Sequence, residues 1–283
     1  MIQKKVILNS PKVEELKKKR RKELRNKIIF WAVIVLVFFI ILIFLSRIKK
    51  INIDTVVISG NKIVETKDIE NIVKMDLSGN YMYFLPHSNR FIYPEKKIKN
   101  DLMDKFKRII DISLDLKGNK ILEVNVKERD GKYLYCGETA ISIDTTTGCY
   151  FIDDNGYIFD NAPYFSDGVY FKFYGHLDDT DNNPVGLYFL KNDFMRLVSF
   201  KENLEKLNLK INSFFLNTEG YLVINLSSGA EIRFKPDADF DKLIQNLHAA
   251  LTTEPFHTDF QKKYDSLLYI DLRFGNKIYY KFR

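Results

Sequence analysis

Two cysteines are the side chains whose type and spacing most directly predict chemistry in this chain. Cys136 and Cys149 each border a run of residues with strand-like alternation, so the two thiols can face each other across the intervening segment. In an oxidising compartment such a pair forms a disulfide, and closing a loop of about fourteen residues stabilises a fold by roughly 3 kcal/mol in the chain-entropy model. We favour the disulfide. The alternative is two buried free thiols.

The remaining candidate motifs do not predict a catalytic or metal-binding site. The sequence has no Gly-x-Ser-x-Gly, no phosphate-binding glycine loop and no His-Glu-x-x-His. The four histidines have no metal-ligand spacing: His87, His176, His248 and His257. Residues 144–148, DTTTG, superficially resemble an aspartic-protease turn but are better interpreted as a loop. We therefore expect no enzyme activity, no cofactor and no bound metal.

One acidic stretch partly resembles a calcium-binding loop. Asp179, Asp181 and Asn183 have the alternate spacing of such a loop, but Pro184 stands where the turn requires glycine. No glutamate closes the loop at its twelfth position. We do not expect calcium to bind here.

An uninterrupted apolar run near the N-terminus predicts a membrane helix. Residues 28–45 read IIFWAVIVLVFFIILIFL and contain no charged or polar side chain. As a helix this run is about 27 Å long, close to the hydrocarbon thickness of a bilayer. We assign residues 28–46 to a transmembrane helix. A cleaved signal peptide is the weaker alternative, because Ser46-Arg47-Ile48-Lys49 is not a small-x-small cleavage site.

The charge of the chain is concentrated in the tail that precedes this helix. The formal net charge is +7, yet residues 1–27 alone carry eleven Lys and Arg against three Glu. The rest of the chain is near neutral, so the basic balance is not a sign of nucleic-acid binding. Basic residues mark the cytoplasmic side of a membrane helix. The tail is expected in the cytoplasm and residues 47–283 outside it.

The remaining sequence predicts an α+β fold in two parts. In the first part we expect a strand at residues 51–58, a helix at 67–74 with Thr66 as N-cap, a helix after Pro94, and a hairpin at 109–116 and 120–127. In the second part we expect helices at residues 191–209 and 237–251. The strands expected there are residues 140–143, 150–153, 157–160, 169–174, 211–216, 221–226, 230–234, 267–274 and 277–282. Gly275-Asn276 joins the last two as a hairpin.

Several stretches in this order resemble the FtsQ/DivIB family of bacterial cell-division proteins. The stretches are IDTVVISGN (53–61), VETKDI (64–69), ILEVNVKERDGKYLYC (121–136), CYFIDDNGYIF (149–159), LSSGAEIRF (226–234) and YIDLRFGNKIYYKF (269–282). The resemblance implies a βααββ module of the POTRA type at residues 51–128 and a larger strand-rich module at 129–283. The aromatic stretch at residues 81–93 departs from the family pattern.

The resemblance also implies a function. Members of this family are non-enzymatic scaffolds at the division septum that bind other single-pass division proteins, of the FtsB/DivIC and FtsL kind. Binding by addition of a partner strand to an open sheet edge is the expected mode. The last strand has only Arg283 after it, so its outer edge is expected to be uncovered.

The resemblance implies partner contact at the end of the chain. Phe274, Asn276 and Phe282 match positions that the family uses, and Ile278 and Tyr280 share their parity, which predicts one common face. The alternative is an ordinary edge strand that faces the core and is protected by its lysines. For the whole protein, the alternative functions are a membrane-anchored envelope sensor or substrate-binding module, and a membrane-anchored enzyme with unrecognised chemistry.

Overall fold

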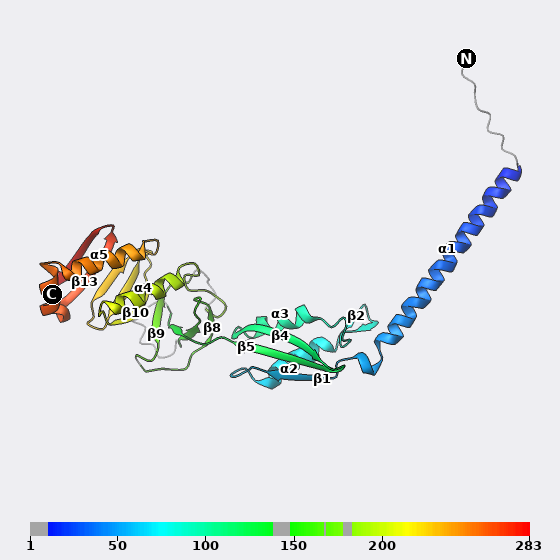
Figure 1. Ribbon diagram of the computed structural model, residues 1–283, viewed down its shortest axis with the longest axis horizontal. Coiled ribbons are helices and arrows are strands. Elements are labelled where there is room, and N and C mark those ends of the chain that lie inside the picture. Colours follow the sequence, from blue (N-terminus) through cyan, green and yellow to red (C-terminus); the bar gives the residue numbers. More distant parts are fainter. Residues whose placement is uncertain (1–10, 138–147, 167, 178–182) are drawn as a thin grey trace, which may run out of the picture. The chain divides into compact units, whose positions relative to one another are not determined.

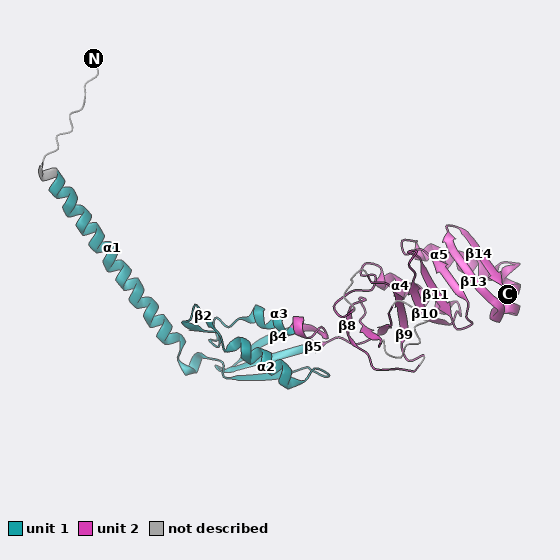
Figure 2. Cartoon of the chain, turned by 180° about the vertical axis from the view of Figure 1, so that it is seen from behind, with its two compact units in different colours: residues 1–102, 112–126 teal, residues 103–111, 127–283 magenta. Residues whose placement is uncertain are grey.

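The structure is a computed structural model that describes residues 11–137, 148–166, 168–177 and 183–283. The expected strand at residues 140–143, the threonines at 145–147, and Asp179 and Asp181 lie outside the described residues. The chain divides into two compact units (Figure 2). Met1–Leu102 and Ile112–Val126 make the first unit, and Met103–Asp111 and Lys127–Arg283 make the second.

A single long helix opens the described chain. α1, Pro11–Ser46, contains the whole apolar run and is long and apolar enough to cross a membrane. Its apolar side chains are exposed; Trp31 and Phe44, for example, are 64% and 73% exposed. In hydrocarbon only a helix or a closed barrel satisfies the backbone hydrogen bonds, so lipid favours a helix even for this β-branched sequence. A 3-10 turn, η1 (Lys49–Ile51), follows it.

Beyond α1, the first unit contains a small sheet and two helices. The elements are β1 (Thr55–Ser59), α2 (Thr66–Leu77), β2 (Asn80–Tyr81), β3 (Leu85–Pro86), α3 (Glu95–Lys105), β4 (Ile109–Lys117) and β5 (Ile121–Glu128). The end of α3, the start of β4 and the end of β5 belong to the second unit in the division given above. The sheet order is β1-β5-β4, and β1 and β5 run parallel. β2 and β3 pair separately as a short hairpin. Ile69 and Val73 of α2, Ile98 and Leu102 of α3, and Leu122 and Val124 of β5 are fully buried.

The start of α2 differs from the sequence prediction. Glu65 is the N-cap residue, and Thr66 is already helical. The Thr66 hydroxyl is occupied elsewhere, because Asn61 Nδ2 donates a hydrogen bond to it at 3.0 Å. The prediction of Thr66 as the cap is therefore wrong by one residue.

The second unit contains a large mixed sheet. Within the described residues its strands are β6 (Tyr133–Tyr135), β7 (Tyr150–Ile152), β8 (Ile158–Asn161), β9 (Phe171–Gly175), β10 (Ile211–Leu216), β11 (Leu222–Leu226), β12 (Glu231–Phe234), β13 (Leu267–Phe274) and β14 (Lys277–Phe282). Their order is β14-β13-β12-β11-β10-β9-β6-β7-β8. The helical elements are α4 (Phe194–Lys206), α5 (Phe240–Thr252), α6 (Phe256–Lys263) and η2 (Tyr264–Ser266).

Helices connect two of the parallel strand pairs of this sheet, whereas β7 and β8 lie along the chain between the strands of the parallel pair β6–β9. β9 and β10 run parallel and are joined through α4, while β12 and β13 run parallel and are joined through α5 and α6 (Figure 1). Parallel neighbours need such long crossovers, whereas β10–β11 and β13–β14 are antiparallel hairpins with short turns. The Asp239 side chain caps α5 by accepting a hydrogen bond from the Lys242 N–H at 3.1 Å.

Aromatic and aliphatic side chains fill the space between α4, α5 and the sheet. Phe173, Phe214 and Phe234 of the strands are fully buried, as are Phe194 and Leu204 of α4. The rings of Phe173 and Phe214 stack with centroids 5.5 Å apart. Each such side chain stabilises the fold by roughly 1.5–3 kcal/mol relative to an exposed position. This core fixes the sheet whose last strand is discussed next.

Two arginines hold the segment Met103–Asp111 within the second unit. Arg108 Nε lies 2.7 Å from Asp160 Oδ2, and its guanidinium lies 5.0 Å from the centre of the Phe159 ring. Arg129 pairs with Asp153, and Arg129 Nε donates to the Lys107 carbonyl at 3.1 Å. Both arginine side chains are largely buried.

Candidate functional site

The free edge of the large sheet is the candidate functional site. It is formed by the β13–β14 hairpin, whose turn at Gly275-Asn276 places Gly275 at φ 68°. Glycine adopts this left-handed conformation without the steric cost that a side chain would add. β14 is the last strand of the sheet and pairs with β13 on one side.

One face of β14 packs on the core of the second unit. Ile278, Tyr280 and Phe282 are half-buried and contact the core cluster. The Tyr280 ring lies 4.1 Å, centre to centre, from the ring of Phe256 in α6. These three side chains are anchored inward and are not displayed as a free surface.

Phe274 lies on a different surface from these three residues. It is 55% exposed, and its ring meets that of the exposed Tyr279 edge to face at 5.2 Å. The expectation that Phe274 shares one face with Ile278, Tyr280 and Phe282 is therefore wrong. The pairing register shifts between Asp271 and Phe274, which moves Phe274 opposite Lys277 and breaks the parity of the prediction. Asn276 is exposed in the turn.

The backbone of β14 alternates between its paired and its outer side. The Arg283 N–H donates to the Ser266 carbonyl at 2.8 Å, so the backbone of Arg283 points toward β13. Because N–H and C=O directions alternate along a strand, the backbone groups of Ile278, Tyr280 and Phe282 point to the outer side. Within the described parts of the chain, β13 is the one strand that pairs with β14. The outer groups are thus available to another strand.

The opposite edge of the sheet is protected. The Ile158 N–H of β8 donates to the Leu187 carbonyl at 2.9 Å, and its carbonyl accepts from the Gly186 N–H at 2.8 Å. Phe189 N–H donates to the Gly156 carbonyl at 2.9 Å. The segment around residues 186–189 therefore covers β8, whereas no described segment covers β14 in this way. Exposed edges favour pairing with another chain, and the lysines at positions 277 and 281 limit indiscriminate pairing.

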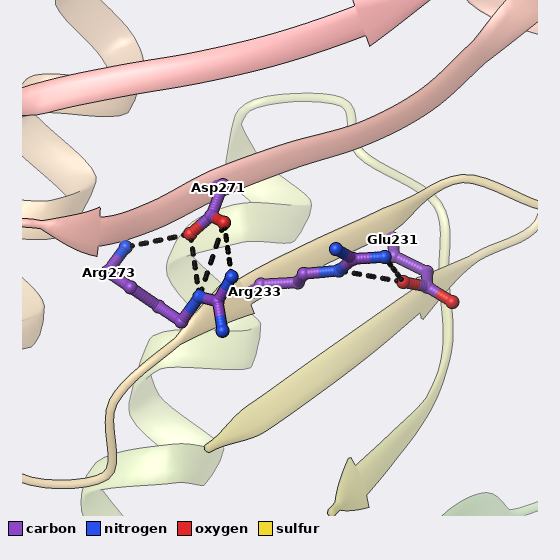
Figure 3. Close-up of polar contacts among 4 residues, drawn as sticks. All are labelled: Glu231, Arg233, Asp271 and Arg273. Carbon is purple, nitrogen blue, oxygen red and sulfur yellow. Dashed lines mark hydrogen bonds and ion pairs between the residues drawn. The ribbon is translucent and has the colours of Figure 1, made fainter. Parts of the chain in front are cut away.

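Beside this edge, the face away from the helices carries a row of charged side chains (Figure 3). Arg273 Nη2 lies 2.7 Å from Asp271 Oδ2, and Arg233 Nη2 lies 2.7 Å from Glu231 Oε2. Arg233 is the register partner of Asp271. Burial raises the pKa of Asp271, but the hydrogen bonds and charge of Arg273, together with the charge of Arg233, lower the pKa by more, so the net pKa lies below 3.8.

Arg273 also packs against aromatic rings on this face. Its guanidinium lies 4.5 Å from the centre of the Tyr221 ring and 5.7 Å from that of Phe274. The arginine therefore links the ion pair to the exposed ring at the hairpin turn. Tyr279, its neighbour Phe274 and Arg273 form a continuous surface that sequence parity did not predict. The sequence does contain a signal for the exposure of Tyr279. It has the same parity along β14 as Lys277 and Lys281, so it shares their exposed face.

The two cysteines are joined in the structure. Cys136 and Cys149 form a disulfide with their Cα atoms 4.3 Å apart. Cys136 follows β6 and Cys149 precedes β7, and these strands pair antiparallel with Tyr135 opposite Tyr150. The register of the two strands thus brings the cysteines to adjacent positions at one end of the pair.

A comparison with protein-family models gave no match, and no curated protein matches the chain. Among the described residues, no cluster of three or more His, Cys, Asp or Glu side chains is placed to hold a metal ion.

Proposed function

We propose that this chain is a membrane-anchored, non-enzymatic scaffold of bacterial cell division of the FtsQ/DivIB kind. In this proposal α1 spans the cytoplasmic membrane, the basic tail lies in the cytoplasm, and both units fold outside it at the septum. The resemblance of six stretches supports this assignment, as does a first unit whose order is the β-α-α-β-β of a POTRA module with the short β2–β3 hairpin between its two helices. The observation that carries the proposal is the unpaired outer edge of β14.

The binding mode is the addition of a strand. A segment of an FtsB/DivIC-like protein, itself in complex with an FtsL-like protein, pairs with the outward backbone groups of Ile278, Tyr280 and Phe282. Backbone hydrogen bonds supply affinity, and side chains on either side of the edge supply selectivity. Phe274, Asn276 and Tyr279 are exposed around this edge and contribute the side-chain contacts.

The first experiment compares the intact protein with a version that ends at Asn276. Both are recovered from membranes with their bound proteins, and circular dichroism establishes that the truncated protein is folded. The proposal expects the intact form to retain a small single-pass, coiled-coil partner that the truncated form loses. Equal recovery of that partner by the two forms would place the contact elsewhere.

A pair of substitutions at one position tests the backbone mechanism more sharply. Tyr280→Pro and Tyr280→Ala both remove the ring that packs on Phe256, but only proline also removes the outward N–H. One backbone hydrogen bond contributes about 1 kcal/mol, so we expect Tyr280→Pro to bind the isolated partner at least about fivefold more weakly than Tyr280→Ala. Equal dissociation constants for the two variants argue against strand addition. Capture of no division protein by any form favours the sensor or substrate-binding alternative.

A further inference from the structure

An exposed apolar turn forms the tip of the β2–β3 hairpin in the first unit. We call residues Tyr81, Met82, Tyr83 and Phe84 the aromatic tip. Met82 and Tyr83 are 83% and 90% exposed, and Phe84 is 54% exposed. Large apolar side chains displayed together in this way mark a surface that contacts something else.

The backbone of the aromatic tip has a conformation that its residue types rarely adopt. The Phe84 N–H donates to the Tyr81 carbonyl at 3.0 Å, which closes a four-residue turn. Met82 and Tyr83 occupy its two central positions at φ 47° and 67°. Such turns normally carry Asn-Gly or Asp-Gly, because positive φ brings Cβ too close to the backbone, a cost that glycine avoids and asparagine or aspartate tolerates best. Neither turn formation nor core packing explains Met and Tyr at these positions, which points to a role in contact.

The aromatic tip lies next to the residue at which the membrane helix ends. Arg47 Nε donates to the Phe84 carbonyl at 3.4 Å. Asn52 Nδ2 and Asn89 Nδ2 both donate to the Ser46 carbonyl, at 3.1 and 3.2 Å. Ser46 follows the apolar run of α1, so the bond from Arg47 places the hairpin beside the end of that run, and the bonds from Asn52 and Asn89 hold the flanking segments there.

Residues around the aromatic tip have the composition of a membrane interface. Phe91 is exposed, and the guanidinium of Arg90 lies 5.4 Å from the centre of its ring. Arg47, Lys49 and Lys50 are exposed just after α1. Aromatic rings prefer the headgroup level of a bilayer, and cations there interact with lipid phosphates.

We propose that the aromatic tip is a second membrane anchor, which inserts Met82, Tyr83 and Phe84 into the headgroup region of the bilayer that α1 spans. The occupant of this surface is phospholipid, because the hairpin contacts the end of a helix whose own exposed apolar side chains require lipid to cover them. The inference requires α1 to span the membrane but does not depend on a role in cell division. It assigns the first unit a fixed contact with the bilayer surface.

Tryptophan fluorescence with brominated lipids tests the proposal in the full-length protein. The chain has a single tryptophan, Trp31, in α1, so Trp31→Phe provides a silent background. Tyr83→Trp is placed in this background, and Tyr164→Trp, at a site that is 95% exposed in the second unit, is the matched control. Each protein is reconstituted in phosphatidylcholine–phosphatidylglycerol vesicles, with and without phosphatidylcholine brominated near the headgroup end of its acyl chains.

We expect Tyr83→Trp to emit at shorter wavelength than Tyr164→Trp and to lose most of its emission to the brominated lipid, while the control loses little. Phe84→Trp is a second probe outside the two strained positions and should behave like Tyr83→Trp. Probes at 83 and 84 that emit as in water and are not quenched would overturn the proposal. A blue-shifted but unquenched probe also overturns it and assigns the surface to a protein contact.

Quenching of Trp31 in the wild-type protein tests separately whether α1 spans the membrane. Quenching of Trp31 by brominated lipid, with no quenching at position 83, refutes the second anchor alone. Absence of quenching at Trp31 removes the premise of both proposals.

Discussion

The ion pair between Arg129 and Asp153 joins two largely buried side chains, 15% and 7% exposed. Asp153 also accepts hydrogen bonds from the N–H groups of Asn155 and Tyr157 at 2.8 and 3.0 Å, so the same carboxyl group holds the turn before β8. Removal of one partner leaves a buried charge unpaired, and we expect Arg129→Ala to lower the free energy of unfolding by about 3 kcal/mol. Urea denaturation followed by circular dichroism measures this loss.

The surface pair of Lys263 and Asp259 provides the control for that substitution. Both side chains are solvent-accessible, at 56% and 35%, and lie one helical turn apart in α6. Lys263→Ala should change the unfolding free energy by less than about 0.5 kcal/mol. Similar losses of unfolding free energy in the two variants would mean that burial does not increase the contribution of the Arg129–Asp153 pair to stability.

The carboxylate of Asp271 makes stability depend on pH. Its pKa in the folded protein lies below 3.8, its usual value, because Arg273 and Arg233 outweigh the effect of burial. A lowered folded pKa stabilises the protein at pH values above 3.8, and this contribution is lost as pH falls toward the folded pKa. We expect Asp271→Asn to be less stable than the wild type at neutral pH and the difference to shrink below about pH 4. Denaturation at a series of pH values measures it, and a difference that is constant with pH contradicts this account.

The disulfide between Cys136 and Cys149 is a prediction about the oxidised protein. We expect no alkylation of the unfolded, unreduced protein and two added labels after reduction, as measured by mass spectrometry. The double variant Cys136→Ser with Cys149→Ser should lose roughly 3 kcal/mol, since the cross-link then no longer restricts the unfolded chain. Two labelled thiols without reductant would show that the pair is not oxidised in the protein.

Strands and turns differ in how far the sequence predicted them. Alternation and glycine turns predicted the hairpins β4–β5 and β13–β14, and helical periodicity predicted α4 and α5 to within a few residues. α6 was missed because its two turns offer only Phe256 and Phe260 as an apolar pair. The β2–β3 hairpin was missed because Met82 and Tyr83 occupy positions where Asn-Gly is the usual signal.

The candidate binding edge was also predicted only in part. The sequence predicted an edge hairpin at the end of the chain, because strand pattern and turn residues are local features. It correctly placed Ile278, Tyr280 and Phe282 on one face, but it wrongly added Phe274 to that face, since one register shift beside Phe274 reverses its assignment. Alternation within one strand cannot reveal a shift that the pairing of two strands creates. Hydrogen-bond partners, such as Asn61 for the hydroxyl of Thr66, were equally inaccessible.

Replacement of the β2–β3 turn tests whether its backbone is strained. The double variant Met82→Asn with Tyr83→Gly introduces the residues that this turn prefers, so we expect the unfolding free energy to rise by about 1–2 kcal/mol. The control variant with alanine at both positions removes the exposed side chains but retains the positive φ angles, and it should show no such gain. Thermal unfolding in detergent compares the three proteins. Equal gains in the two variants would assign the effect to the exposed side chains and not to the backbone.

At the scale of the whole molecule, one orientation in the membrane is predicted, and it can be measured with introduced cysteines because the two native ones are paired. Because they are joined as a disulfide in the structure, the wild-type protein has no free thiol to react with a maleimide. A single cysteine can then be introduced at Lys19, in the basic part of α1, or at Glu219, in the exposed turn before β11. The variants are expressed in cells from which any outer membrane is removed, and a membrane-impermeant maleimide is then added. We expect it to label Glu219→Cys directly and Lys19→Cys only after the cytoplasmic membrane is opened.

The reverse labelling pattern would place both units in the cytoplasm, where a structural disulfide does not persist. In that case Cys136 and Cys149 should also be reduced and react with the maleimide in the opened cells. The orientation of α1 therefore determines two other properties. It decides whether the cysteines can remain oxidised and whether β14 can reach a partner outside the membrane. Labelling at position 219 with unreactive native cysteines supports all three. Labelling at position 19 in unopened cells contradicts the division scaffold proposed from the free edge of β14.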